Sequence, residues 1–174
     1  IHINYKSAQV DQVYFPQIEV VGDIALSVDA LADALGSKLE IDLEDFEKVR
    51  DNVKGKIFPL DEEPVFPMRP QNIVSAIRNL MGYHDIIALD NGVYKIWFAR
   101  NYLAFQPNTI LLDNALATMG AGLPSAMLAA MIHPNRKVMS ICGDGGFMMN
   151  SQEIETAVRL NLNLVVLILN DNSY

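Results

Sequence analysis

The sequence has few of the features that mark extracellular, membrane-spanning or nucleic-acid-binding proteins. It contains one cysteine, Cys142, which excludes an internal disulfide framework and is typical of a reducing compartment. It has no apolar run near the roughly 20 residues that a membrane-spanning helix needs. Its 13 basic residues form no cluster and are outnumbered by 21 acidic ones, which argues against a nucleic-acid surface. We therefore expect a cytoplasmic protein without membrane or nucleic-acid partners.

The composition that is present is globular and acidic. Apolar residues make up 51% of the 174 residues, and the net charge is −8. An anionic ligand would therefore have to be held by backbone N–H groups or by a metal ion. The chain begins without Met, inside the apolar alternation of Ile1 and Ile3, and it stops soon after a polar turn at Asp171. We therefore expect a fragment of a longer enzyme.

Hydrophobic periodicity divides the chain into three parts. Residues 1–36 have the pattern of the tail of an α/β unit, with two short strands and a helix that ends at Gly36. Residues 37–69 are acidic and then proline-rich, which predicts an interdomain linker with one exposed helix. From Pro70 to the end, helices and strands alternate regularly.

This alternation predicts a doubly wound α/β domain, in which a parallel sheet is covered by helices on both faces. The expected strands are 86–89, 109–112, 137–142 and 164–169, and the expected helices begin near residues 70, 96, 120 and 151. We expect the first of these helices to bury Ile73, Ala76, Ile77 and Leu80. We expect the last to be capped by Asn150 or Ser151, with Glu153 in the capping-box position to Asn150.

The candidate site begins where the strand at 137–142 ends, with Gly143, Asp144, Gly145 and Gly146. Glycines let the backbone approach an anion closely, because they have no Cβ atom. The carboxylate of Asp144 suits Mg²⁺, which takes oxygen ligands and shares itself with substrate phosphates. In open parallel sheets, ligands bind beyond the carboxyl ends of the strands. This turn is therefore a candidate for binding a metal and a phosphate.

A second polar turn follows one crossover later, at Asn170, Asp171 and Asn172. Since parallel strands end at one edge of a sheet, we expect Asp171 to converge with Asp144, 27 residues earlier. Either turn alone is typical of an ordinary loop, but together they favour a metal-bridged diphosphate. A dinucleotide fingerprint fails because Met148 stands where the third glycine is needed. A Walker-type Gly-Lys-Ser/Thr turn is lacking.

The spacing of the two turns resembles the thiamine diphosphate (ThDP) motif, which runs from Gly-Asp-Gly to a closing Asn or Asp. In this chain the motif is Gly143–Gly145 followed by Asn170–Asp171. Two wider stretches, Thr118–Pro124 and Gly143–Met148, are similar to acetolactate synthase and its relatives. The resemblance implies thiamine diphosphate and Mg²⁺ as cofactors.

The resemblance covers nearly the whole chain and implies its domain organisation. Residues 1–36 look like the end of the family's Rossmann-like middle domain, residues 37–69 like the linker, and residues 70–174 like the first part of its pyrophosphate-binding domain. The family's activating Glu belongs to an N-terminal domain outside this chain and normally comes from a partner subunit. The resemblance therefore implies no catalytic residue in this fragment, which alone should be inactive, and a homodimer or homotetramer with a shared site.

Carried over position by position, the resemblance implies a metal site and a diphosphate site. Mg²⁺ would be bound by the carboxylates of Asp144 and Asp171 and by the main-chain carbonyl of Ser173. The residues that would cradle the diphosphate are Gly143, Gly145 and Gly146, with Gly145 and Gly146 donating N–H groups.

The resemblance also implies contacts to the rest of the cofactor. The carbonyl of Ala117 would receive the 4′-amino group, and Met119 would be the apolar wedge that bends the cofactor and holds an intramolecular base at high effective concentration. Val93 and Tyr94 stand in a cofactor loop where biosynthetic members have Gln and His. The run Ile96–Arg100, together with Asp171 in place of the commoner Asn, looks closer to the catabolic, FAD-free branch, and FAD is left open.

The activity implied is that of a carboligase, which decarboxylates pyruvate and transfers the two-carbon unit to a second 2-keto acid, in branched-chain amino acid or acetoin metabolism. The cofactor would supply the electron sink, and the protein would supply positioning and electrostatics. Two alternatives stay open. One is another ThDP-dependent 2-keto acid decarboxylase or carboligase. The other is a ThDP-fold module that binds no cofactor and only packs subunits.

Overall fold

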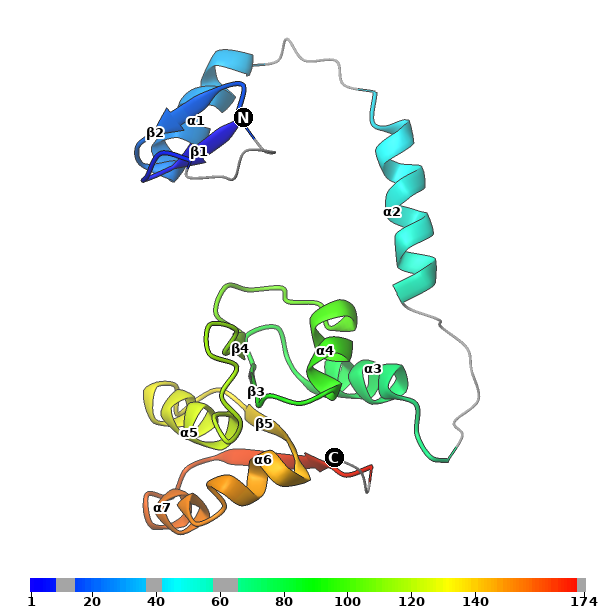
Figure 1. Ribbon diagram of the computed structural model, residues 1–174, viewed down its shortest axis with the longest axis vertical. Helices are drawn as coiled ribbons and strands as arrows, with labels where there is room; N and C mark the ends of the chain where they lie inside the picture. Colours follow the sequence, from blue (N-terminus) through cyan, green and yellow to red (C-terminus); the bar gives the residue numbers. More distant parts are fainter. Residues whose placement is uncertain (9–14, 37–41, 58–65, 172–174) are drawn as a thin grey trace. The chain divides into compact units, whose positions relative to one another are not determined.

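A computed structural model describes residues 1–8, 15–36, 42–57 and 66–171. The chain divides into two compact units, Ile1–Arg50 and Asp51–Tyr174 (Figure 1). The domain boundaries expected from the sequence, after residues 36 and 69, remain predictions. Within the described ranges, no helix is long and apolar enough to cross a membrane.

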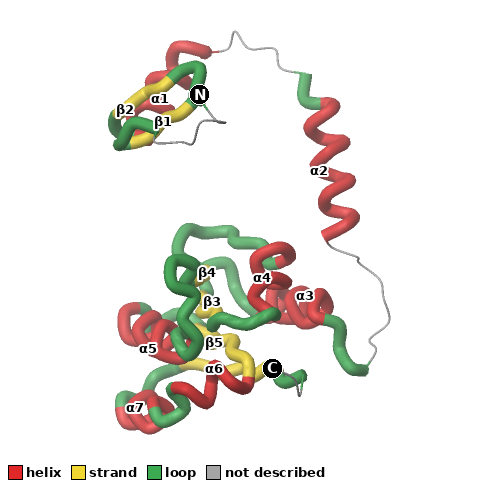
Figure 2. Tube along the Cα trace, in the orientation of Figure 1, coloured by secondary structure: helices red, strands yellow, loops and turns green. Residues whose placement is uncertain are grey.

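The described residues of the first unit include two parallel strands, a helix packed on them and the first part of a second helix (Figure 2). Strands β1 (His2–Asn4) and β2 (Glu19–Val21) pair in parallel, and helix α1 (Ile24–Leu35) packs against β1. Gly36 ends α1 with a positive φ of 50°, which confirms the predicted helix end. The exposed helix expected in the linker is α2 (Glu44–Ile57), whose residues 44–56 are all exposed.

The second unit is built on a four-stranded parallel sheet with the strand order β4-β3-β5-β6. Its strands are β3 (Ile86–Leu89), β4 (Ile110–Leu112), β5 (Val138–Gly143) and β6 (Leu164–Leu169). The chain runs from β3 outward to β4 and then crosses back to β5 on the other side of β3. The order in which strands are added to the sheet therefore reverses between β3 and β5. Open α/β sheets bind ligands at such a switch point.

Helices cover both faces of this sheet, which confirms the predicted fold class (Figure 1). Helices α3 (Pro70–Leu80) and α4 (Tyr94–Asn101) pack on one face, and α5 (Gly122–Ile132) packs on the other. The predicted buried face of α3 is wrong in part. Val74, Ile77 and Met81 face the sheet, whereas the predicted Ala76 and Leu80 are exposed. The reason is that the 3-4 spacing that meets Ile87 and Leu89 starts at Val74.

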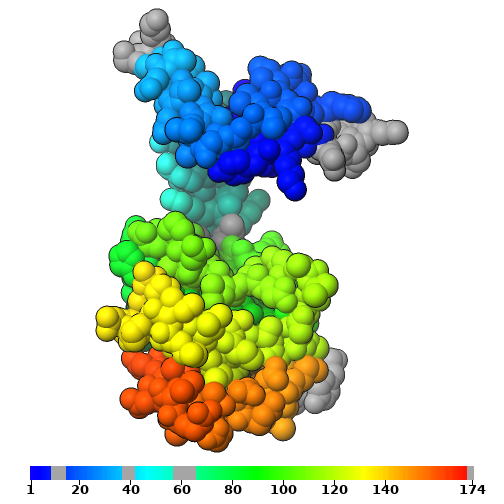
Figure 3. Space-filling model, turned by 90° about the vertical axis from the view of Figure 1, so that its left-hand side faces the viewer, coloured from blue at the N-terminus to red at the C-terminus, as the bar shows by residue number. Residues whose placement is uncertain are grey.

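Two short helices lie between β5 and β6, where the sequence predicted one. They are α6 (Asp144–Met149) and α7 (Glu153–Arg159), and both pack beside α5 (Figure 3). Helix α6 begins directly at the strand end, with Gly143 as its N-cap residue. The glycine-rich turn is therefore the first turn of a helix, whose N–H groups point back toward the strand ends.

Candidate functional site

The carboxyl ends of the three neighbouring strands β3, β5 and β6 bring polar residues to one edge of the sheet. Strand β3 is followed by Asp90, β5 by Asp144 and β6 by Asn170–Asp171. The register pairs Gly143 with Leu169, so that Asp144 and Asn170 leave the sheet at the same level. The structure thus brings together the two turns that the sequence singled out.

Asp144 begins helix α6, and we call Gly143–Gly146 the metal turn. Its Oδ1 accepts a hydrogen bond from the Gly145 N–H at 2.8 Å, and the side chain is half-buried. Gly146 is buried, and a Cβ there would lie 3.0 Å from Cγ of Asp90 and closer still to its carboxylate oxygen. Only glycine fits this position without displacing a neighbour. A carboxylate at a helix start beside a tight glycine backbone suits a metal-bound diphosphate.

The predicted metal ligands lie at neighbouring strand ends. Asp171 is exposed and lies two residues beyond the end of β6. Ser173, whose carbonyl was the third predicted ligand, lies outside the described residues. In the part of the chain that the structure describes, no three His, Cys, Asp or Glu residues gather as a metal site. The metal-binding roles of Asp144, Asp171 and the Ser173 carbonyl remain predictions.

Residues 113–121, which we call the binding loop, follow β4 and carry Ala117 and Met119. Ala117 has a φ of 49°, in the left-handed region that few non-glycine residues adopt, and it is exposed. Met119 is 44% exposed. The loop presents a strained backbone and an apolar side chain to solvent, and such strain persists only where surrounding contacts fix it.

Side chains at the ends of β3 and β4 supply some of these contacts. Oδ2 of Asp113 accepts from the Thr118 N–H at 3.3 Å, and this hydrogen bond lowers the pKa of Asp113. Nδ2 of Asn91 donates to the Thr118 carbonyl at 2.7 Å. The ammonium of Lys95 donates to Oδ1 of Asn91 and to the Asp113 carbonyl. The N–H and the carbonyl of Thr118, directly before Met119, are therefore both fixed by hydrogen bonds.

Gly120, directly after Met119, is held in the same way. It has a φ of 85° and is buried. Its N–H donates to both carboxylate oxygens of Asp90, at 2.8 and 3.0 Å, and its carbonyl accepts from Nδ2 of Asn150 at 2.7 Å. The predicted Asn150 cap is wrong for this reason: its side chain is committed to Gly120, and Gln152 stands at the N-cap of α7. Ser151 is not the N-cap residue either.

The two predicted cofactor contacts in the loop after β3, Val93 and Tyr94, differ from each other in exposure. Val93 is 75% exposed. Tyr94 turns its ring against the core, and its hydroxyl donates to the Ile141 carbonyl at 3.3 Å. Burial, reinforced by the negative charge of Asp90, raises the pKa of Tyr94 well above its usual range. Trp97 also packs against this core.

Asp90, Asn91, Lys95 and Asn150 were missed by the sequence reasoning. Asp90 and Asn91 follow a buried strand, as Asp144 does, so the same strand-end pattern was available as a signal. Asn150 was expected to cap a helix rather than to contact the binding loop, and only their contacts show the roles of Lys95 and Asn150.

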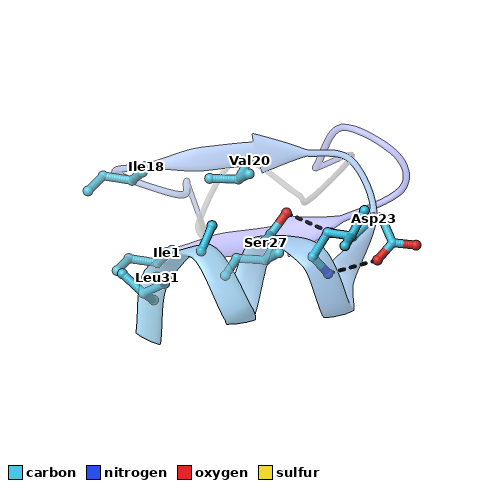
Figure 4. Close-up of a pocket in the computed structure, with 9 residues that line it drawn as sticks. Ile1, Ile18, Val20, Asp23, Ser27 and Leu31 are labelled. Carbon is cyan, nitrogen blue, oxygen red and sulfur yellow. Dashed lines mark hydrogen bonds between the residues drawn. The ribbon is translucent and has the colours of Figure 1, made fainter. Parts of the chain in front are cut away.

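An apolar hollow of about 490 Å³ lies in the first unit, between the two strands and α1 (Figure 4). Its polar lining residues are Asp23 and Ser27. Asp23 accepts from the Leu26 N–H at 2.9 Å and from the Tyr5 hydroxyl at 3.1 Å, and Ser27 donates to the Asp23 carbonyl at 2.6 Å. These groups cap α1, so the hollow lacks the convergent polar groups of a catalytic site.

The fold and the strand-end site have the character of a cofactor-binding α/β domain, and comparison with known families agrees. Residues 90–174 match the family described as thiamine pyrophosphate enzyme, C-terminal TPP binding domain. Over this segment the chain is similar to the thiamine pyrophosphate enzymes. The match begins at Asp90 and includes the binding loop, the metal turn and the end of β6.

Similarity to individual proteins extends over the whole chain. The chain is 34% identical over 180 residues to the catabolic acetolactate synthase of Raoultella terrigena. It is 32% identical over 179 residues to the acetolactate synthase of Bacillus subtilis, and both matches cover 100% of the chain. It is 30% identical over 187 residues to a probable acetolactate synthase large subunit of Methanococcus aeolicus. The chain spans 32%, 31% and 31% of these relatives, or about a third of their length. The predicted resemblance to an acetolactate synthase-type segment is confirmed.

Proposed function

We propose that the intact protein is a ThDP- and Mg²⁺-dependent carboligase of the acetolactate synthase type. The observation that carries this proposal is the pairing of Gly143 with Leu169, from which Asp144 and Asn170–Asp171 leave adjacent strands at one level. Two carboxylates beside a helix N-terminus provide hard oxygen ligands for Mg²⁺, together with N–H groups for the diphosphate that shares the ion. The net charge of −8 supports a metal-mediated mode of anion binding.

The residues present fit the cofactor. A Cβ on Gly146 would collide with the Asp90 carboxylate, so a glycine is needed there. We propose that the backbone of Gly143, Gly145 and Gly146 forms the diphosphate cradle. The Ala117 backbone is held in a left-handed conformation, which supports a role for its carbonyl as acceptor of the 4′-amino group. Met119 offers an exposed apolar side chain for the bend of the cofactor. When bound, ThDP supplies the electron sink for decarboxylation of a 2-keto acid.

The chain's own residues would bind and orient, while the groups that move protons come from elsewhere in the assembly. We propose pyruvate as the first substrate and a second 2-keto acid as the acceptor. A Glu from another domain, on a partner subunit, would activate the cofactor. Exposed apolar side chains on α5 and α6 support a homodimer or homotetramer in which such sharing occurs; they are Leu128, Met131, Ile132, Met148 and Met149.

Two further assignments belong to this proposal. The resemblance of Ile96–Arg100 to the catabolic branch supports an enzyme without FAD, and flavin absorbance of the purified protein tests that directly. The single cysteine supports a reducing compartment, so we propose the cytoplasm.

The test is the product that the intact protein forms from pyruvate in the presence of ThDP and Mg²⁺. We expect acetolactate. Acetaldehyde as the main product would replace the proposal with a ThDP-dependent decarboxylase. A protein that neither binds ThDP nor turns over pyruvate would fit a module that only packs subunits, and it would refute the catalytic proposal.

A further inference from the structure

Asp90 is a buried carboxylate at the switch point between β3 and β5, where the strand order of the sheet reverses. It follows β3, is 0% exposed, and its N–H donates to the Ile141 carbonyl of β5 at 2.9 Å. This hydrogen bond extends the β3–β5 ladder, so the Asp90 backbone is fixed by two central strands. A carboxylate is costly to bury unless hydrogen bonds satisfy it, so its partners indicate what it does there.

The Asp90 side chain contacts both parts of the candidate cofactor site. Its two oxygens accept the Gly120 N–H at 2.8 and 3.0 Å, which holds the end of the binding loop. Its Oδ1 also accepts the Asn91 N–H at 2.7 Å. On its other side lies Gly146 of the metal turn, where a Cβ would be 3.0 Å from the carboxylate carbon. A Cβ on Gly122, in the first turn of α5, would be 2.7 Å from the Asp90 Cβ.

A second side chain links the same two parts from the opposite direction. Asn150 follows α6, the helix that begins with the metal turn, and its Nδ2 donates to the Gly120 carbonyl at 2.7 Å. Gly120 is therefore bonded at its N–H to β3 and at its carbonyl to the end of α6. Its φ of 85° is a backbone conformation that residues with a side chain rarely adopt, so substitution of Gly120 would introduce strain.

We propose that Asp90 is a positioning residue, which with Asn150 fixes the distance between the binding loop and the metal turn and so sets how the two halves of ThDP are held relative to each other. This inference rests on the proposed function. Met119 directly precedes the clamped Gly120, so release of Gly120 would move the wedge relative to the diphosphate end. A displacement of about 1 Å in a reacting geometry changes rates by about 100-fold.

The experiment uses the intact protein and the variants Asp90→Ala, Asp90→Asn and Asn150→Ala. Each is measured for ThDP affinity by calorimetry with Mg²⁺, for melting temperature, and for the rate of hydrogen–deuterium exchange at C2 of bound ThDP by quenched NMR. The exchange rate at saturating cofactor reports how the pyrimidine is placed against the thiazolium. Lower stability alone does not change it.

We expect Asp90→Ala and Asn150→Ala to slow this exchange by about 10- to 100-fold at full occupancy. Asp90→Asn should be affected less, because its amide oxygen can still accept the Gly120 N–H. The matched control is Ser140→Ala, since Ser140 is also 0% exposed but contacts Cys142 rather than either loop. It should exchange within about 2-fold of the parent rate.

Exchange at the parent rate in saturated Asp90→Ala and Asn150→Ala proteins would overturn the positioning role, whatever their melting temperatures. If Asp90→Ala does not fold, Asp90→Asn and Asn150→Ala still decide the question, and both at the parent rate would overturn it. A parent protein that fails to bind ThDP would instead refute the proposed function, and this inference with it.

Discussion

The binding loop and the metal turn lie at the same edge of the sheet but are held differently. The binding loop is fixed by the protein itself, because Thr118 and Gly120 are bonded on both sides of Met119. The metal turn instead offers a half-buried carboxylate and a helix start, beside the exposed Asp171. The protein therefore preorganises one end of the site, and under the proposed function an ion and a diphosphate would complete the other.

This difference makes Asp144 the position with the largest expected effect on binding. Asp144→Ala should weaken ThDP binding in the presence of Mg²⁺ by on the order of 100-fold or more, since it removes the proposed direct metal ligand and outer-sphere changes alone cost about 10- to 100-fold. Calorimetric titration of the intact variant measures this. The control is Glu155→Ala, which removes an exposed carboxylate of α7 paired with Arg159 at 3.4 Å. Parent-like binding by Asp144→Ala would show that the metal assignment is wrong.

Gly120→Ala tests the preorganised end. It places a Cβ 2.8 Å from Nδ2 of Asn150 on a backbone with positive φ. We expect a loss of about 1–3 kcal/mol in unfolding free energy and a roughly 10-fold weaker affinity for ThDP. Denaturant unfolding and calorimetry measure the two effects. Gly55→Ala is the matched control, because no atom lies within 4 Å of a Cβ there. Equal behaviour of the two variants would contradict a fixed binding loop.

Ala117 separates a backbone role from a side-chain role within the binding loop. Ala117→Gly should leave ThDP affinity within about 3-fold, because glycine adopts the observed φ of 49° and keeps the carbonyl. Ala117→Val should destabilise the protein by about 1–2 kcal/mol, because a β-branched residue is strained in this conformation. Thermal unfolding compares the pair, and equal stability of the glycine and valine variants would argue against the strained geometry.

The smallest expected effect concerns Cys142, which is 0% exposed beneath the site. Burial raises the pKa of its thiol. The resulting stability is present below the unfolded-state pKa and is lost as pH rises through the folded one, by up to about 1.4 kcal/mol per pH unit. Stability of the parent should therefore fall more steeply than that of Cys142→Ala in alkaline buffer. Parallel pH profiles would show that the thiol does not contribute.

Hydrophobic periodicity predicted much of the fold, and the polar residues that follow the strands predicted the metal turn. Strands 86–89 and 164–169 were predicted with their observed bounds, because continuous apolar runs of that length in a regular alternation have few other interpretations. Helix α6 was missed because Gly145 and Gly146 have low helix propensity, which the packing at the strand end overrides.

The rest of the site depends on long-range contacts that have no local signal. The bonds from Asp90 and Asn150 to Gly120 each join residues 30 apart in sequence. The Asn150–Glu153 pattern predicted a capping box, but a tertiary hydrogen bond took the Asn150 side chain instead. Local patterns therefore located the metal turn, whereas the supports of the binding loop appeared only with the fold.

The central claim is that the diphosphate end is held through a metal ion between β5 and β6. It is tested most directly by titrating ThDP into the intact protein with Mg²⁺ and again with excess EDTA. We predict saturable binding with Mg²⁺ and a loss of affinity on the order of 100-fold without it. Equal affinity under both conditions would contradict the account.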